Sequence, residues 1–178
     1  MHATLADVIA DTAQNSIEAG AKHVSVTLVE DGQTIAVTIT DDGKGMDEAT
    51  QARAFNPFYT EAGKHDKRKV GLGLPILKQL CEATDGAVSL TSQKGVGTEL
   101  RYSFSATHID LPPMGDLAAA VLSLFTFDGD FEMVFRHRRG GEEYEISRSE
   151  LKDAVGGFDT VDGMSLAKEF LASQESSL

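Results

Sequence analysis

The sequence predicts an α/β protein, built as a two-layer sandwich of helices on a mixed or antiparallel sheet. Two pairs of short segments alternate apolar and polar residues, and each pair is joined by a glycine-containing turn, which indicates two β-hairpins. Helix-like segments precede and separate these hairpins. This order of elements differs from repeated βαβ units, so we do not expect a purely parallel sheet.

The first helix is expected over residues 4–19, where apolar and small residues recur at helical spacing. Gly20 is well placed to end this helix. Residues 24–28 and 35–39 then alternate apolar and polar side chains on either side of an Asp-Gly turn. This pattern predicts a β-hairpin with one buried face.

An acidic, glycine-rich turn at residues 41–46 follows the first hairpin. Asp47 is a suitable N-cap for a short helix that ends near Phe55. Residues 60–70 show no periodicity and contain four cationic side chains, so we expect a flexible loop there. A helix over 74–83 and a second hairpin over 87–104 complete the order of elements.

Residues 110–113 (Asp-Leu-Pro-Pro) predict a boundary turn, which divides the chain into residues 1–106 and 107–178. The second part is expected to be a small α/β appendage. Its expected elements are a helix at residues 116–125, a hairpin at 131–146, helices at 149–155 and 164–171, and a disordered tail at 173–178. We expect this appendage to dock on the first part or on a partner, because its hairpin is too small to be stable alone.

Composition and charge exclude several classes of function. The chain has 178 residues and a net charge of −12, which argues against nucleic acid as the main partner because phosphate backbones are bound by surplus Lys and Arg. No segment approaches the roughly 18 consecutive apolar residues of a membrane span, and the N-terminus lacks a signal-peptide pattern. The single cysteine, Cys81, lies in an apolar helical run, so we expect a buried thiol. A cytoplasmic protein with no membrane contact is expected.

One face of the first helix is polar. Its residues are spaced by four, four and three: Asp7, Asp11, Asn15 and Glu18. The plain interpretation is a solvated helix face. The functional alternative is that the Asn15 carbonyl binds Mg²⁺, which prefers oxygen ligands, while Asp11 one turn earlier holds a metal-bound water or accepts a proton.

The glycine turns suggest a nucleotide pocket. Asp41 ends a strand, where its carboxylate can accept a hydrogen bond from an adenine amino group, and Gly43 and Gly45 let the backbone approach the base. Gly71 and Gly73 precede a helix, so backbone N–H groups there are free to approach a polyphosphate. Each turn taken alone is equally compatible with an ordinary structural turn.

Taken in order, these residues resemble the ATP-binding domain shared by histidine kinases, anti-sigma-factor serine kinases, DNA gyrase, heat-shock chaperones and MutL-type repair ATPases. The resemblance covers residues 4–105. It implies the Bergerat-type sandwich, with ATP and Mg²⁺ as cofactors, Asp11 in the catalytic position and Asn15 on the metal. The nucleotide-binding residues that it implies are Asn15, Asp41, Gly43, Gly45, Met46, Phe58, Lys64, Lys69, Gly71, Leu72, Gly73, Leu74 and Thr98.

The resemblance is not uniform along the chain. Residues 56–60 and 94–98 are similar to the histidine kinase aromatic box and final glycine-Thr turn, whereas residues 14–21 are similar to the repair ATPases. Asp11 stands where the family often has Glu, and Lys69 where the kinase pattern often has glycine. None of the five histidines lies in the context of a phosphoacceptor helix, so self-phosphorylation on His is not expected.

Three functions remain open from the sequence. The first is a stand-alone regulatory protein that binds ATP or ADP and phosphorylates, or switches, a separate protein partner. The second is an ATPase that forms a homodimer when it binds ATP. The third is a binding module that keeps the fold without catalysis. We favour the first.

Overall fold

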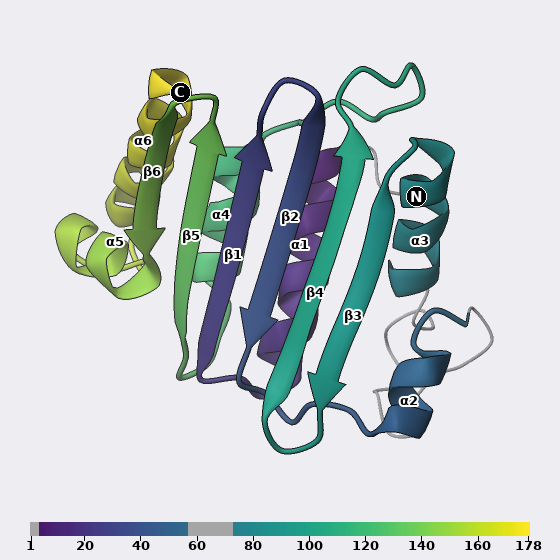
Figure 1. Ribbon diagram of the computed structural model, residues 1–178. Helices are drawn as coiled ribbons and strands as arrows, with labels where there is room; N and C mark the ends of the chain where they lie inside the picture. The colour runs from purple at the N-terminus through teal and green to yellow at the C-terminus, as the bar shows by residue number, and fades with distance from the viewer. Residues whose placement is uncertain (1–3, 57–72) are drawn as a thin grey trace.

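The computed structural model describes residues 4–56 and 73–178 of the chain. Its centre is one six-stranded sheet in the order β3-β4-β2-β1-β5-β6, viewed in Figure 1 from the face that carries no helix. The strands are β1 (His23–Glu30), β2 (Thr34–Asp41), β3 (Ala87–Gln93), β4 (Gly97–Ser105), β5 (Glu132–Arg139) and β6 (Glu142–Ser147). Every neighbouring pair is antiparallel except β1 and β5, which are parallel. The predicted α/β sandwich with a mixed sheet is therefore confirmed.

Six helices are formed by the described residues, and α1 and α4 lie behind the sheet in Figure 1. The helices are α1 (Leu5–Glu18), α2 (Glu48–Arg53), α3 (Gly73–Ala83), α4 (Leu117–Phe125), α5 (Arg148–Val155) and α6 (Val161–Ser177). None of the helices in this part of the chain is long and apolar enough to cross a membrane.

The apolar stripe of α1 packs against the inward-facing residues of the first hairpin. Leu5, Ile9 and Ala13 are buried on α1, and Val26 and Leu28 are completely buried on β1. Leu28 pairs with Val37 across the hairpin, so both strands direct their apolar residues toward the helices. Cys81 of α3 is also buried in this core, as predicted, and burial raises the pKa of its thiol to about 11.

The stretch predicted as a boundary is hydrogen-bonded to the start of α1. The first two N–H groups of the helix, from Leu5 and Ala6, donate to the carbonyls of Pro113 and Met114 at 2.9 and 2.8 Å. The Thr4 hydroxyl accepts from the Asp7 N–H and completes a capping box. These bonds satisfy helix donors that would otherwise have no partner within the helix.

The C-terminal part continues the sheet rather than forming a second one. β5 pairs along the whole of β1, from His23 opposite Glu132 to Glu30 opposite Arg139. α4 packs on both α1 and α6. The division of the chain at residues 106 and 107 into two domains stays a prediction.

Arg148 fixes the loop between α4 and β5. Its guanidinium donates to the carbonyls of Phe125 and Phe131 at 2.7 and 2.9 Å, and to that of Phe127 at 3.2 Å. The same group lies 4.3 Å from the centre of the Phe131 ring. One side chain therefore connects the end of α4 with the start of β5 through carbonyls on both sides of this loop.

The prediction of a disordered tail at residues 173–178 was wrong. α6 continues to Ser177, and Glu175 near its end contacts a histidine that is completely buried, His137 of β5. Nδ1 of His137 lies 3.0 Å from Glu175 and its Nε2 lies 2.8 Å from Glu30 of β1. The Tyr144 hydroxyl also donates to Glu175. These polar contacts order the last turns of α6.

The two carboxylates also determine the charge of this cluster. Burial opposes protonation of His137, but hydrogen bonds to Glu175 and Glu30 outweigh it and raise the pKa of the imidazole. The hydrogen bond with His137 lowers the pKa of Glu30 against the effect of burial, and Arg139 lowers it further. The two carboxylates therefore favour protonation of His137 relative to a free imidazole.

Candidate functional site

Asp41 is oriented by two hydrogen bonds at the end of β2. The Ser16 hydroxyl of α1 donates to Oδ2 at 2.5 Å, and the Gly43 N–H donates to Oδ1 at 2.9 Å. The side chain is half-buried, next to the last turn of α1. A carboxylate held in this way presents fixed acceptor positions to a ligand.

The glycine turn after Asp41 lies so close to other backbone that side chains are excluded. A Cβ on Gly45 would lie 1.9 Å from the Gln93 carbonyl oxygen, and Gly45 has a φ of +61°. A Cβ on Gly97 would lie 1.9 Å from the Asp41 carbonyl oxygen. Both positions therefore require glycine, and the turns 41–46 and 93–97 pack directly on one another.

Hydrogen bonds connect these turns to each other and to α1. The Lys44 N–H donates to the Ala19 carbonyl at 3.1 Å, and the Gly95 N–H donates to the Lys44 carbonyl at 2.7 Å. The Met46 N–H donates to Ser92 Oγ at 2.8 Å, and the same hydroxyl lies 2.8 Å from Thr98 Oγ1. The predicted residues Met46 and Thr98 thus meet at Ser92.

Two residues on the polar face of α1 make hydrogen bonds within the helix. Asp7 is the third residue of the helix and forms the capping box with Thr4. Glu18 accepts a hydrogen bond from Gln14 at 2.7 Å. Asp11 is exposed and Asn15 is half-buried, one turn apart. Asp11 and Asn15 are the two residues of this face for which the sequence predicted a catalytic and a metal-binding role.

The start of α3 lies against Asp11. A Cβ on Gly73, the first residue of α3, would be 3.0 Å from Asp11 Oδ2. The N-terminal end of a helix carries unpaired N–H groups and a partial positive charge, which attract anions. Asp41, Asn15, Asp11 and the first turn of α3, with Gly73 and Leu74, thus lie along one side of α1.

Several predicted site residues lie outside the described part of the chain. They are Phe58, Lys64, Lys69, Gly71 and Leu72. The predicted loop at 60–70 also falls there, as do residues 57–60 of the aromatic box. These assignments stay predictions.

Ser16 and Ser92, which support Asp41 and Thr98, were not predicted from the sequence as site residues. Ser16 directly follows Asn15, and its place on the inner side of α1 was the available signal. Ser92 had no signal, because its partners lie on other elements: besides Met46 and Thr98, its N–H donates to Gln51 Oε1 at 2.5 Å.

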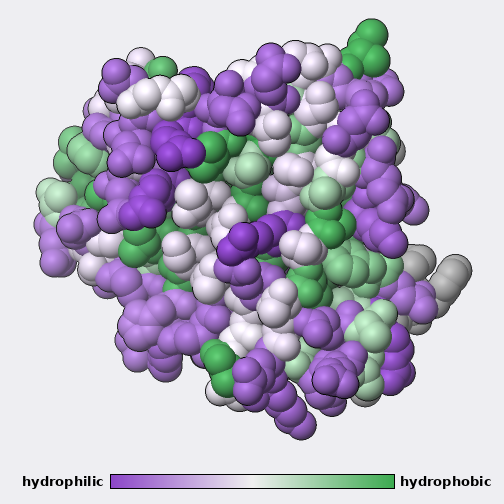
Figure 2. Space-filling model, in the orientation of Figure 1, coloured by the Kyte–Doolittle hydropathy of each residue, from purple (hydrophilic) through white to green (hydrophobic). Residues whose placement is uncertain are grey.

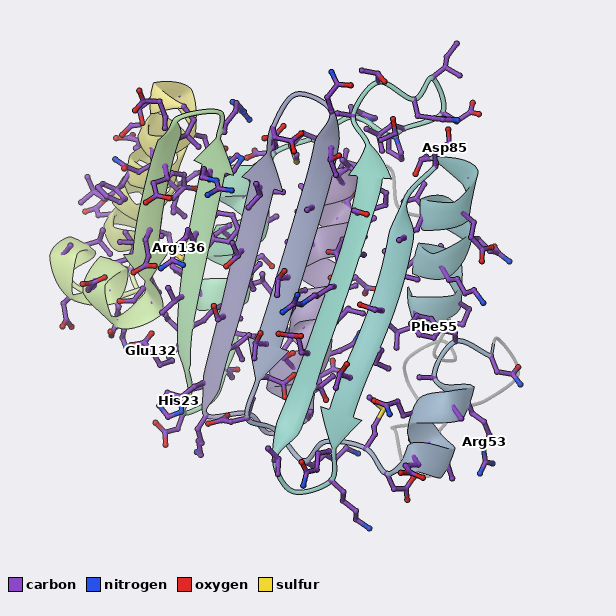
Figure 3. All side chains as sticks on the ribbon, in the orientation of Figure 1. His23, Arg53, Phe55, Asp85, Glu132 and Arg136 are labelled. Carbon is purple, nitrogen blue, oxygen red and sulfur yellow. The ribbon has the colours of Figure 1, made fainter. Side chains whose placement is uncertain are left out.

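Asp42, the second aspartate of the turn, has a structural role. It accepts hydrogen bonds from the backbone N–H groups of Lys22 and His23 at 2.7 and 2.9 Å. The ring Nδ1 of His23, at the lower end of β1 in Figure 3, lies 2.7 Å from the same carboxylate. The hydrogen bonds from the His23 backbone and ring lower the pKa of Asp42 to about 2. This carboxylate therefore fixes the start of β1.

The donor groups fit a magnesium ion held mostly by a nucleotide. No group of three or more His, Cys, Asp and Glu side chains within residues 4–56 and 73–178 could hold a metal. Mg²⁺ in nucleotide sites usually takes one or two protein oxygens and completes its shell with phosphate and water. The Asn15 amide oxygen, with Asp11 nearby, is a donor set of this kind.

Two curated relatives match the region that contains this site. The chain is 38% identical over 104 residues to the heme sensor protein HssS of Staphylococcus saprophyticus, which covers 58% of this chain and 22% of that protein. It is 37% identical over 90 residues to the sensor histidine kinase YcbM of Bacillus subtilis, which covers 48% of this chain and 29% of the relative. The matched region is thus less than a third of either relative.

The fold likeness extends further along the chain. A crystal structure of the N-terminal domain of a DNA repair protein superimposes with a TM-score of 0.61 over 90% of this chain and 58% of that one. The sequence identity is 13%, so this match shows the fold alone.

A family model covers most of the first part of the chain. The family described as histidine kinase-, DNA gyrase B-, and HSP90-like ATPase matches residues 2–108, which include α1, the Asp41 turn and both hairpins of the site. The expected resemblance is confirmed. The chain belongs to the family of histidine kinase-, DNA gyrase B- and HSP90-like ATPases, and residues 2–108 are its histidine kinase-like ATP-binding domain.

Proposed function

We propose that this protein binds Mg-ATP between α1, the Asp41 turn and the start of α3, and acts as a stand-alone, kinase-like regulator of a separate protein in the cytoplasm. The observation that supports this most is the fixed Asp41 carboxylate. Ser16 and Gly43 orient it beside the last turn of α1, and Asp11 of the same helix lies against the start of α3. The base, the metal ion and the phosphates of Mg-ATP would therefore contact groups that lie along α1.

In this proposal each residue has one role. Asp41 accepts a hydrogen bond from the adenine amino group, while Gly43 and Gly45 leave room for the base beside the backbone. Met46 and Thr98 line the same end of the pocket through their shared contact with Ser92. Asn15 binds Mg²⁺, and bound Mg-ATP supplies the transferable phosphoryl group.

The phosphates are assigned to the first turn of α3. Gly73 and Leu74 offer backbone N–H groups at the positive end of this helix. Gly71 and Leu72 extend the same glycine box, and Phe58, Lys64 and Lys69 complete the proposed nucleotide-binding set. Asp11 lies against Gly73, which supports a role in which its carboxylate accepts a proton or holds a water molecule close to the phosphates.

A second candidate is an ATPase that dimerises when it binds ATP. The observation that favours it is the similarity of residues 14–21, in the last turn of α1 and just beyond it, to the repair ATPases. A nucleotide-binding module without catalysis is the third.

One set of assays separates the three. Calorimetry with Mg-ATP should show binding, and Asp41→Asn should weaken it. With γ-labelled ATP, transfer of label to a co-purified protein supports the proposed regulator. Phosphate release together with ATP-dependent dimerisation, measured by sedimentation, supports the ATPase. Binding without either indicates the module, and absence of binding would contradict all three.

A further inference from the structure

A groove of about 230 Å³ lies between α5 and α6, far along the sheet from the nucleotide site. Its lining is entirely apolar: Ile146, Leu151, Ala154, Val155, Leu166 and Phe170. Figure 2 shows hydrophobic surface at the left margin of the molecule, where α5 and α6 lie. Apolar surface of this kind, bordered by polar residues, is typical of a site that binds another molecule.

Two helical stripes form the walls of this groove. On α5, Leu151, Ala154 and Val155 are three and four residues apart, so they share one face. On α6, Leu166 and Phe170 are four residues apart and also share one face. Leu151 is buried and forms the floor, whereas Leu166 and Phe170 remain 53% and 41% exposed.

The segment of the chain that forms the groove is predominantly acidic. Residues 142–178 contain nine Asp and Glu and only three Lys and Arg. One of the three, Arg148, is engaged with loop carbonyls. Asp162 lies on the same α6 stripe as Leu166 and Phe170, one turn earlier, and Glu169 lies next to Phe170; both are exposed. The groove is therefore apolar within, and it lies in a segment of net negative charge that exposes Asp162 and Glu169 on its α6 wall.

We propose that this groove binds an amphipathic helix of a partner protein that carries Lys and Arg beside its apolar face. A helix of this kind places residues i, i+3 or i+4, and i+7 into a hydrophobic groove, and its cations would meet Asp162 and Glu169. A second copy of this chain is disfavoured, because a symmetric contact would bring two strongly negative surfaces together. The proposal does not depend on the proposed function, since no residue of the nucleotide site takes part.

The test uses the full chain and three labelled synthetic peptides of about 18 residues, long enough to form a helix. The first has Leu at helical spacing flanked by Lys, the second has Glu in place of Lys, and the third is a scrambled form of the first. Fluorescence anisotropy should show binding of the first peptide only, and this binding should weaken as salt is added.

Variants on α6 locate the contact. Leu166→Asp and Phe170→Asp should each weaken binding about tenfold or more, because each places a charge within the apolar contact. Val161→Asp is the matched control: Val161 is 83% exposed on the same helix but does not line the groove, so its variant should bind as the wild type does. Asp162→Asn combined with Glu169→Gln should weaken binding severalfold and reduce the salt dependence.

Three results would overturn the proposal. The first is equal binding of the three peptides or failure of the Lys peptide to bind. The second is unchanged affinity in both Leu166→Asp and Phe170→Asp. The third is a wild-type dimer in sedimentation that Phe170→Asp converts to monomers, because the groove would then be filled by a second copy.

Discussion

Replacing Glu175 with Gln tests how the end of α6 is held on the sheet. Glu175 contacts buried His137 and accepts from the Tyr144 hydroxyl, so the substitution removes a charge from two hydrogen bonds while it keeps the side-chain size. A hydrogen bond to a charged group contributes about 1.5–3 kcal/mol, and removal of one partner of a buried pair costs about 3–5 kcal/mol. Glu30 continues to pair with His137, so we expect the lower range, about 1.5–3 kcal/mol at pH 6.

The loss of folding free energy in Glu175→Gln should decrease as the pH rises. The pKa of His137 is raised in the folded protein above the unfolded value of about 6.5. Its charge therefore stabilises the fold fully below about pH 6.5, and this contribution is lost as the pH rises through the folded pKa. Glu30 titrates below this window, because its pKa is lowered, and burial raises that of Tyr144, so neither changes charge between pH 6 and 9.

Urea unfolding at pH 6, 7, 8 and 9 measures the difference in the free energy of unfolding between wild type and Glu175→Gln. Glu169→Gln is the control on the same helix, since its exposed side chain should change stability by no more than about 0.5 kcal/mol. The difference for Glu175→Gln should shrink as the pH rises. A difference that stays constant across this range, or one no larger than in the control, would contradict the claim that a charged His137 paired with Glu175 stabilises the fold.

Four further predictions concern the site and the fold. Asp41→Asn should weaken Mg-ATP binding in calorimetry by about 1.5–3 kcal/mol, whereas Asp153→Asn, an exposed position on α5 at the β6 end of the sheet, should not; equal affinities would remove the role in base recognition. Asn15→Ala should abolish the gain in ATP affinity that Mg²⁺ gives and leave metal-free ADP binding intact, and if the Mg²⁺ dependence survives, another ligand holds the ion. Arg148→Lys should destabilise the fold in urea by about 1–3 kcal/mol, because an ammonium group cannot reach the carbonyls of Phe125 and Phe131 together; an unchanged midpoint contradicts this. A fragment of residues 1–106 should aggregate or lose stability, because it leaves β1 as an open edge and removes α4 from α1, and a soluble fragment that binds ATP normally would show the opposite.

The sequence by itself determined the elements whose patterns are local. The helical spacing of apolar residues in α1 and the alternation in β1 and β2 predicted these elements correctly, because each side chain is directed by the period of its own segment. The glycines of the Asp41 turn were also evident from the sequence. Gly45 and Gly97 prove to be required where two stretches of backbone pass too close for a Cβ.

The tertiary structure alone decided which distant segments meet. Nothing in the pattern of β5 indicated that it pairs in parallel with β1, because strand pairing depends on the packing of whole faces and not on one segment. The tail was predicted to be disordered because it is a terminal segment, yet Glu175 orders it through His137, about forty residues away. Likewise, Ser16 contacts Asp41 only because the fold brings the end of β2 to α1, and Asp42 contacts His23 only because the turn lies at the start of β1. The role of a polar side chain depends on which partners the folded chain brings within hydrogen-bond distance.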